Sequence, residues 1–224
     1  IQSYHNALNM KKNFAWLLIA LLVFLVVLPV AEDFAIIDGP VMRVAMFTSL
    51  LSIGVISLRG FGPLYIAGLA MALLGIILNI VAVDSDSLYL GMASLASASL
   101  FVIVAIWATG RQIIPGDEIS ANRVIGAVNL YLLFGVLWAM VYALDEKIAP
   151  GSFAGLSEPL NQGWSSEWVY FSFVTMTTLG YGDITPVSAT AKTLAYMQAV
   201  FSQFYLAILV AGLVGAYYAR RLKT

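Results

Sequence analysis

The sequence predicts an all-α membrane protein with six membrane-spanning helices and one shorter re-entrant helix in each chain. The first reason is composition: 61% of the residues are hydrophobic and 10% are charged, against about 45–50% and about 25% in soluble domains. The second is the length of the apolar runs, because a span needs about 20 apolar residues. The third is a Gly-Tyr-Gly-Asp run at residues 180–183, between two apolar runs. Non-helical backbone at membrane depth is tolerated only where protein buries it or water reaches it.

The composition also excludes several classes of protein. A net charge of -1 provides no basic face for nucleic acid. The absence of cysteine excludes disulfides, thiolate metal sites and cysteine nucleophiles. The only histidine, His5, lies in a polar leader, so one chain forms no histidine metal site or catalytic dyad. On the cytoplasmic side we find no paired carboxylates acting as acid and base, no nucleophile–base pair and no phosphate-binding loop, and therefore expect neither an enzyme nor a cofactor.

The polar residues 1–13 are expected to form a cytoplasmic leader. Met10-Lys11-Lys12 reads like a natural start, which would make residues 1–9 an upstream extension or an artificial addition. The first apolar run, Phe14–Ala31, exceeds the apolar core of a signal peptide, and Pro29-Val30-Ala31 is a poor cleavage site. We therefore expect a retained helix that spans the membrane.

The apolar runs that follow predict five further spans, at Val41–Leu58, Pro63–Val83, Leu88–Thr109, Val124–Leu144 and Val187–Tyr218. An acidic loop, Asp145–Glu167, and a short amphipathic piece, Trp168–Thr177, separate the last two. The short piece cannot span the bilayer, so we expect it to enter and leave on one side. The predicted parts are a four-helix domain at 14–109, a cytoplasmic linker at 110–123, a helix–re-entrant–helix module at 124–219 and a cytoplasmic tail at 220–224.

The loop charges predict that both termini are cytoplasmic, because basic residues gather on the cytoplasmic side of membrane proteins. In this orientation the inside holds Lys11, Lys12, Arg59, Arg111, Arg123, Arg220, Arg221 and Lys223, and the outside holds only Arg43, Lys147 and Lys192. Most acidic residues lie on the outer side instead. The Gly-Tyr-Gly run then belongs to the outer half of the membrane.

The run Thr178–Gly182 has the chemistry to replace the hydration shell of a cation, with main-chain carbonyls and the Thr178 hydroxyl as oxygen ligands. All the carbonyls can face one axis only if alternate residues take left-handed dihedral angles, which Gly180 and Gly182 adopt at little cost. Tyr181 is expected to point away and pack against the short helix. The negative C-terminal end of that helix would favour a cation. Further negative charge at the outer mouth would come from Glu158, Glu167 and Asp183.

The run Thr175–Asp183 resembles the potassium-channel signature Thr-x-x-Thr-x-Gly-Tyr-Gly-Asp. An aromatic-rich short helix before it, Pro186 after it and the long final helix extend the resemblance over residues 124–219. The similarity is to prokaryotic potassium channels of the two-helix-pore (ion transport 2) superfamily, in a six-span type without a charged voltage-sensor helix. It implies a passive, potassium-selective pore in which K⁺ is coordinated by Thr178, Leu179, Gly180, Tyr181 and Gly182. The potassium-channel filter is itself the standard example of carbonyl coordination, and Thr177 would stand at the base of its pore helix.

The resemblance also implies the assembly and its surroundings. One chain carries one strand of the filter, so four chains would surround the axis as a homotetramer with a voltage-gated-like channel architecture. The implied partners are K⁺ ions, the lipid bilayer and further copies of the chain, without nucleic acid and without a cofactor besides the permeant ion. The implied location is the plasma membrane, the inner membrane of a bacterium.

The filter region departs from the family pattern at two positions. Leu179 replaces the usual Val or Ile, and because its carbonyl is the ligand we expect conduction to survive with altered packing behind the filter. Many relatives place a pore-helix Glu where this chain has Val174. Asp183 therefore lacks a carboxyl partner, and Tyr170 is the expected substitute donor.

Three polar residues interrupt the final helix at membrane depth: Gln198, Ser202 and Gln203. They either bond to neighbouring helices, at about 0.6 kcal/mol each, or line a central water-filled cavity, and we expect at least one of them to line the cavity. Ser202 stands about where relatives carry a hinge glycine. Gly212 and Gly215 lie further along and are alternative hinges.

The four N-terminal helices occupy the place of a voltage sensor. A sensor needs several Arg or Lys residues in its fourth helix, but Leu88–Thr109 carries none and Arg111 stands just past its end. Its small residues instead allow close helix packing, and we expect no strong voltage dependence. Asn79 is expected to form a packing hydrogen bond rather than a ligand contact. The outer acidic residues form either a solvated face or a binding site for divalent cations or protons.

Two other functions remain possible from the sequence. A non-selective cation channel would use the same architecture. A potassium-uptake transporter subunit would also use a re-entrant loop, but such transporters carry several pore repeats in one chain. The gating stimulus is open, since the sequence shows no nucleotide-binding or calcium-sensing domain.

Overall fold

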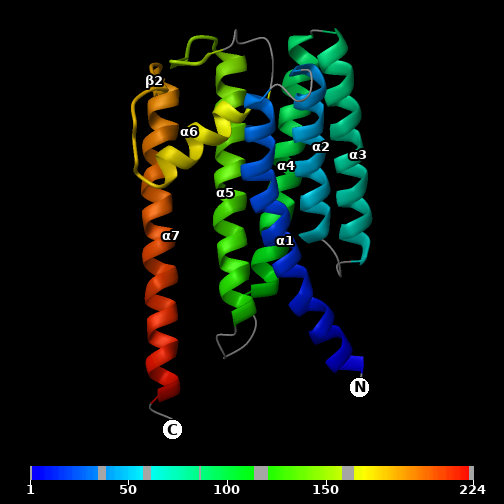
Figure 1. Cartoon of the computed structure of the whole chain (residues 1–224), viewed down its shortest axis with the longest axis vertical. Helices are drawn as coiled ribbons and strands as arrows, with labels where there is room; N and C mark the ends of the chain where they lie inside the picture. The colour runs from blue at the N-terminus through cyan, green and yellow to red at the C-terminus, as the bar shows by residue number, and fades with distance from the viewer. Residues whose placement is uncertain are drawn as a thin grey trace.

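The computed structural model describes residues 2–34, 39–57, 62–85, 87–113, 121–157 and 164–221. Its helices are α1 (Gln2–Asp33), α2 (Gly39–Ser57), α3 (Gly62–Ser85), α4 (Leu88–Ile113), α5 (Ala121–Ile148), α6 (Ser166–Met176) and α7 (Ala189–Arg221), and its short strands are β1 (Phe153–Ala154) and β2 (Thr185–Pro186) (Figure 1).

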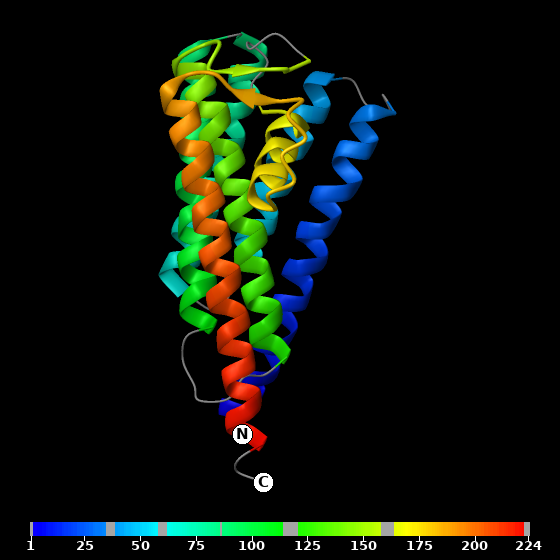
Figure 2. The same cartoon turned by 90° about the vertical axis from the view of Figure 1, so that its left-hand side faces the viewer.

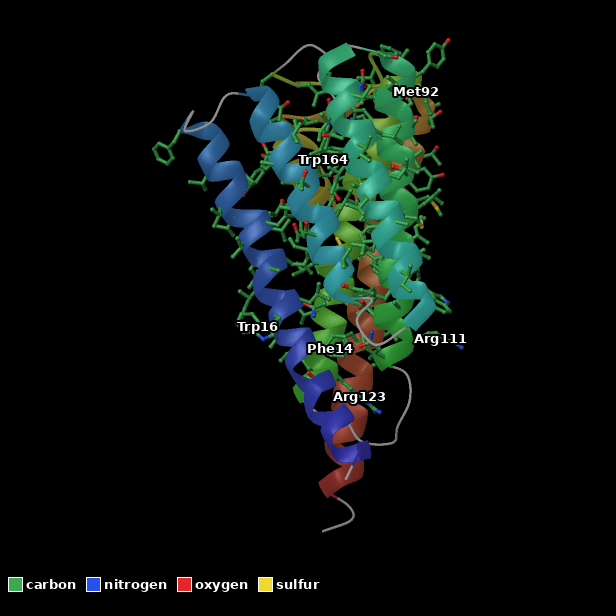
Figure 3. The ribbon with its side chains drawn as sticks, turned by 90° about the vertical axis from the view of Figure 1, so that its right-hand side faces the viewer. Phe14, Trp16, Met92, Arg111, Arg123 and Trp164 are labelled. Atoms are coloured by element: carbon green, nitrogen blue, oxygen red, sulfur yellow. The ribbon has the colours of Figure 1, made fainter. Side chains whose placement is uncertain are left out.

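The long helices lie roughly side by side, and both chain ends lie at the same end of the molecule (Figures 1 and 2). α4 packs along α3 and α5, and α1 packs along α2 and α5. The short α6 lies toward the opposite end, where it contacts α5 and α7. Arg111 and Arg123 lie toward the end that carries the termini, whereas Trp164 lies toward the other end (Figure 3).

Within the described residues, four helical segments are long and apolar enough to cross a membrane: Tyr65–Ala82, Leu88–Ile113, Asn122–Ile148 and Ala189–Gly212. They correspond to four of the six predicted spans. α1 contributes a shorter apolar stretch, Phe14–Val27. The spans predicted in α1 and α2 stay predictions.

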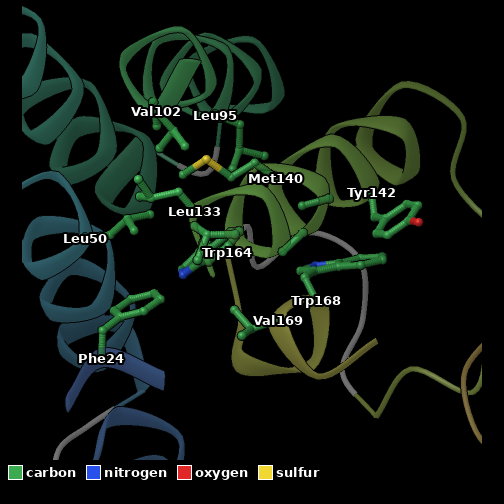
Figure 4. Close-up of a cluster of buried hydrophobic side chains, with 14 of the residues drawn as sticks. Phe24, Leu50, Leu95, Val102, Leu133, Met140, Tyr142, Trp164, Trp168 and Val169 are labelled. Carbon is green, nitrogen blue, oxygen red and sulfur yellow. The ribbon is translucent and has the colours of Figure 1, made fainter. Parts of the chain in front are cut away.

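One buried cluster joins α1, α2 and α5 to the start of α6. Trp164 is only 2% exposed and lies among Phe24 of α1, Leu50 of α2 and Leu133 of α5 (Figure 4). An aromatic side chain buries roughly 150–250 Å². This residue therefore fixes the entry to α6 against the N-terminal helices.

α4 and α5 pack closely along their length. Met140 of α5 lies between Leu95 and Val102 of α4 (Figure 4). Lys147, near the end of α5, is only 8% exposed. Its Nζ lies 3.1 Å from the position that a Cβ on Gly91 would occupy. The N-terminal helices are thus packed directly onto α5 of the same chain.

The helices extend beyond the apolar runs that predicted them. α1 begins at Gln2, so the polar leader is helical, and α5 continues to Ile148, so residues 145–148 of the predicted loop are helical. An apolar run shows only which part of a helix lies in the bilayer. The helix can continue beyond it, because polar residues such as Glu, Lys and Gln are good helix formers. β1 pairs with β2 in an antiparallel register. This ribbon was not predicted, because two-residue strands carry no readable periodicity.

Candidate functional site

α6 ends at Met176, and its C-terminal turn is closed by local hydrogen bonds. The Thr177 amide donates to the Phe173 carbonyl at 3.0 Å, and the Leu179 amide donates to the Val174 carbonyl at 3.0 Å. The Thr177 hydroxyl also donates to the Phe173 carbonyl at 2.6 Å. These bonds fix the direction in which the chain leaves the helix. The chain then returns toward the end from which α6 entered (Figure 1).

Positive φ angles alternate through the returning segment: 61° at Thr178, 59° at Gly180 and 80° at Gly182. The left-handed conformations predicted for the two glycines are confirmed. Thr178 was not predicted to share them, because its branched Cβ makes positive φ a genuine outlier. Backbone strain of this kind, about 1–3 kcal/mol per residue, is typical of functional sites.

Every residue from Thr177 to Asp183 is exposed in the single chain. Among the described residues, no donor bonds to the carbonyl oxygens of Thr178–Gly182. Unpaired backbone groups carry a large free-energy cost in lipid. The segment therefore offers a row of oxygen ligands that needs an ion, water or a further copy of the chain around it.

Tyr170 and Asp183 tie the outer end of this segment to α6. The Tyr170 hydroxyl donates to Asp183 Oδ2 at 2.5 Å, and the Ile184 amide donates to Asp183 Oδ1 at 2.9 Å. The predicted substitute donor is confirmed. This hydrogen bond lowers the pKa of Asp183 and raises the pKa of Tyr170 to about 12. The ring of Tyr181 stacks on that of Tyr170, with centroids 6.5 Å apart, as predicted for a side chain packed against the short helix.

The loop after α5 holds the other side of the segment. At Gly155, where φ is +88°, a Cβ would lie 1.8 Å from the Asp183 carbonyl oxygen, so only glycine fits. β1 directly precedes Gly155 and pairs with β2, which follows Asp183, and the Val187 amide donates to the Ser152 carbonyl at 2.7 Å. The segment is therefore fixed where it leaves the site.

Glu146 orders that loop from within the molecule. It is only 1% exposed, and its carboxylate accepts the amides of Gly151 at 2.5 Å and Phe153 at 2.8 Å. A buried carboxylate with two backbone donors is neither a solvated charge nor an open site for a divalent cation, so both expectations are wrong at Glu146. Proton binding by the outer acidic residues stays a prediction.

The remaining outer acidic residues give a mixed result. Glu167 accepts the amide and the hydroxyl of Ser157 at 3.0 and 2.6 Å. Asp183 is exposed beside the segment, and Glu158 lies outside the described residues. The described ranges contain no group of three or more His, Asp or Glu side chains that could hold a metal ion.

The polar residues of α7 separate into buried and exposed ones. Gln198 and Ser202 are both fully buried and bond within the chain: the Gln198 amide to Ser172 of α6, and the Ser202 hydroxyl to the Gln198 carbonyl at 2.6 Å. They are therefore packing residues rather than cavity-lining ones. Gln203 is exposed, and cavity lining by Gln203 stays a prediction.

Sequence reasoning missed the residues that support the segment from behind. Ser172 and Tyr142 both bond to Gln198, and Gly135 lies so close to α6 that a Cβ would come within 2.5 Å of the Phe173 ring. A glycine, a serine and a tyrosine inside apolar helices are common and carry no signal of their own, whereas the amide of Gln198 at membrane depth does.

The N-terminal helices show no charged ladder in α4. Arg111 lies at its end, with its guanidinium 4.7 Å from the centre of the Trp107 ring. Asn79 in α3 is buried, and its side-chain oxygen has no hydrogen-bond partner among the described residues. The packing hydrogen bond predicted for Asn79 is therefore not made by that oxygen.

Comparison with known proteins places this geometry in context. Residues 129–218, from within α5 into α7, match a protein family described as an ion channel. The match covers α6 and the returning segment. It supports an ion channel of the two-helix-pore family and points to a channel rather than an enzyme; with the apolar helices, it supports an integral membrane protein. No curated protein and no solved structure matches the chain.

Proposed function

We propose that this protein is a potassium-selective channel that conducts K⁺ passively through a filter formed by Thr178, Leu179, Gly180, Tyr181 and Gly182. The observation that carries the proposal is the alternation of positive φ at Thr178, Gly180 and Gly182 in a stretch whose carbonyls accept no hydrogen bond from described residues. Alternate left-handed residues turn successive carbonyls toward a common side, which is what an ion stripped of water needs.

A homotetramer follows from the chemistry of such a filter. One strand surrounds only part of an ion, and closed symmetry supplies the remaining ligands from identical chains. The exposure of residues 177–183 in one chain supports this assembly. Exposed apolar side chains continue along α7, among them Phe204 at 64% and Ile208 at 71%.

The proposed topology has six spans with both termini in the cytoplasm. Arg111 and Arg123 lie toward the same end as the termini (Figure 3), and the positive-inside rule assigns that end to the cytoplasm. The filter then opens outward, with K⁺ ions, lipid and three further copies of the chain as partners and a bacterial inner membrane as its location. Its parts are the predicted four-helix domain at 14–109, the linker at 110–123 and a pore domain at 124–219. Strong voltage dependence is not expected, because each gating charge contributes about 2.3 kcal/mol per 100 mV and α4 carries only Arg111 at its end.

The first test measures ion selectivity. Protein reconstituted in planar bilayers should show single-channel steps, with a reversal potential close to that of K⁺ under opposed K⁺ and Na⁺ gradients. A reversal potential near zero would indicate a non-selective cation channel. Slow flux without single-channel steps would indicate a transporter subunit. Either result would overturn the proposal.

The second test addresses the filter itself. Gly180→Ala places a Cβ at a φ of 59°, which costs about 1–2 kcal/mol for an ordinary residue and should abolish K⁺ flux. Gly110→Ala is the matched control, because Gly110 is helical and has open space around it, and its flux should match that of the parent. If Gly180→Ala conducts normally, the filter lies elsewhere.

A further inference from the structure

One buried amide in α7 bonds to both neighbouring helices. Gln198 is fully buried, and its Nε2 donates to the carbonyl and the hydroxyl of Ser172 in α6, at 3.1 and 2.8 Å. Its Oε1 accepts the Tyr142 hydroxyl of α5 at 2.5 Å. All the donors and the acceptor of this side chain are therefore used.

Ser172 extends the network to the backbone of α5. Its hydroxyl donates to the Gly135 carbonyl at 2.6 Å. At the same point the Phe173 ring packs against Gly135, and a Cβ on Gly135 would lie only 2.5 Å from the ring. The ring contact sets how close α6 lies to α5, and the bonds of Ser172 to Gly135 of α5 and to Gln198 of α7 set the rotation of α6.

The rotation of α6 determines where the filter begins. Met176 ends the helix four residues after Ser172, which is about 6 Å along the axis, and Thr178 begins the filter. Local hydrogen bonds close the turn between them. A helix this short moves as one body, so a rotation at Ser172 displaces the first carbonyls of the filter.

We propose that Gln198 is a positioning residue for ion selectivity, which holds α6 and the filter at a fixed rotation and couples the first half of α7 to them. This inference rests on the proposed channel function. A fully satisfied buried network holds its members in one arrangement, whereas a partly satisfied one leaves buried groups that must move to find partners. The half of α7 that precedes Ser202 is then bonded to α6. If this half of α7 moves away from α6, the filter is displaced and selectivity changes.

The test uses Gln198→Met, which keeps the length of the side chain and removes its amide. In channels that still open, we expect the permeability of Na⁺ relative to K⁺ to rise about fivefold or more, the usual scale of coupling between linked sites. Adding Ser172→Ala to this variant should change the ratio less than it does in the parent, because the two residues share one interaction. A purely structural role would lower the number of assembled channels and leave the ratio of each open channel unchanged.

Tyr205→Phe is the matched control. The Tyr205 hydroxyl donates to the Ala127 carbonyl of α5 at 2.6 Å, so this variant also removes a bond from α7 to α5 but none to α6. Its permeability ratio should equal that of the parent.

If Gln198→Met does not assemble, Tyr142→Phe decides, because it removes one bond and keeps the ring; a smaller rise in the same direction is expected. An unchanged ratio in the deciding variant would overturn the inference. A parent protein that itself fails to discriminate K⁺ from Na⁺ refutes the proposed function before any variant is compared, and the inference falls with it.

Discussion

At the scale of single residues, Thr178 is the clearest mark of function. Glycine adopts a positive φ without cost, but a β-branched residue does so only where its surroundings impose it. Here the Thr178 amide donates to the Thr175 carbonyl at 3.1 Å, which ties the strained residue to the end of α6. The conformation thus places the start of the proposed filter.

The hydrogen bond between Tyr170 and Asp183 should persist over a wide range of pH, because it shifts the pKa of both groups. It lowers the pKa of Asp183 and raises that of Tyr170 to about 12. Its contribution is therefore complete above the ordinary carboxyl pKa and is lost as pH falls through the lowered pKa of Asp183. It is also complete below the ordinary tyrosine pKa and is lost as pH rises through about 12. Between these limits the outer end of the filter should be insensitive to external pH.

Tyr170→Phe should raise the pKa of Asp183 toward its ordinary value, because the main cause of the lowering is removed. The measurement is an NMR titration of the Asp183 carboxyl carbon in detergent-solubilised protein. Tyr89→Phe, at an exposed tyrosine of α4, serves as the control and should leave the titration unchanged. A titration of Asp183 that is the same with and without Tyr170 would contradict this account.

At the scale of elements, the filter is supported on two sides by different devices. α6 bonds to α5 and α7 behind it, and the ribbon of β1 and β2 closes the side where the chain leaves. The loop that carries β1 depends on Glu146, since its carboxylate satisfies the amides of Gly151 and Phe153.

Glu146→Gln should loosen that loop. The substituted amide keeps one acceptor oxygen, so one of the two bonds is lost, and a hydrogen bond to a charged group contributes about 1.5–3 kcal/mol. Amide hydrogen exchange at Gly151 and Phe153 should become faster, while exchange within α3 stays the same. Glu167→Gln is the comparison, because its bonds to Ser157 are exposed and their loss should leave exchange at Gly151 and Phe153 unchanged. Equal protection in parent and Glu146→Gln would show that the carboxylate does not order the loop.

Among the described side chains of α7, Tyr205 makes the last hydrogen bond to α5 along the chain. Ser202 is fully buried, and its hydroxyl donates to the Gln198 carbonyl within the same helix. Gly212 lies beyond Tyr205 and has no neighbours within 4 Å of a Cβ at its position. The hinge of α7 stays a prediction, with Ser202, Gly212 and Gly215 as the candidate positions.

At the scale of the whole molecule, the N-terminal helices and the proposed pore domain form one packed body. The Asn129 side chain of α5 donates to the Phe14 carbonyl of α1 at 2.9 Å, and α4 packs along α5. Movement of the N-terminal helices would therefore act directly on α5. On the opposite side of the molecule, the described residues leave much of α7 and the proposed filter exposed.

Assembly through that side can be tested by crosslinking. The chain has no cysteine, so Phe204→Cys introduces a single thiol on the exposed part of α7. Oxidation in membranes should produce crosslinked dimers, because a single thiol joins one pair of chains. Native mass spectrometry of the same protein should give four chains of 24.2 kDa each.

Ile66→Cys on the exposed side of α3 is the matched control and should not crosslink. Crosslinking of Ile66→Cys but not of Phe204→Cys would place the interface at α3 rather than at α7 and would contradict the proposed assembly. A native mass of any other multiple would contradict the tetramer.

The sequence by itself determined the membrane character, the Gly-Tyr-Gly run and the need for left-handed glycines, because composition and a short contiguous motif carry these properties. It also indicated the bond between Tyr170 and Asp183, since Val174 replaces the usual carboxyl partner of Asp183 and Tyr170 is a hydroxyl donor on the same short helix. Four of the predicted spans correspond to long apolar helices. They could be predicted because a bilayer of fixed thickness requires an apolar run of a minimum length.

Only the tertiary structure decided what lies behind the filter. Whether Gln198 faces water or α6 depends on the rotation of α7, which its contacts with Ser172 and Tyr142 set and which no periodicity records. The role of Glu146 likewise depends on a loop that folds back onto α5. Contacts between residues far apart in the chain are fixed by how surfaces fit together, and therefore a local pattern cannot express them.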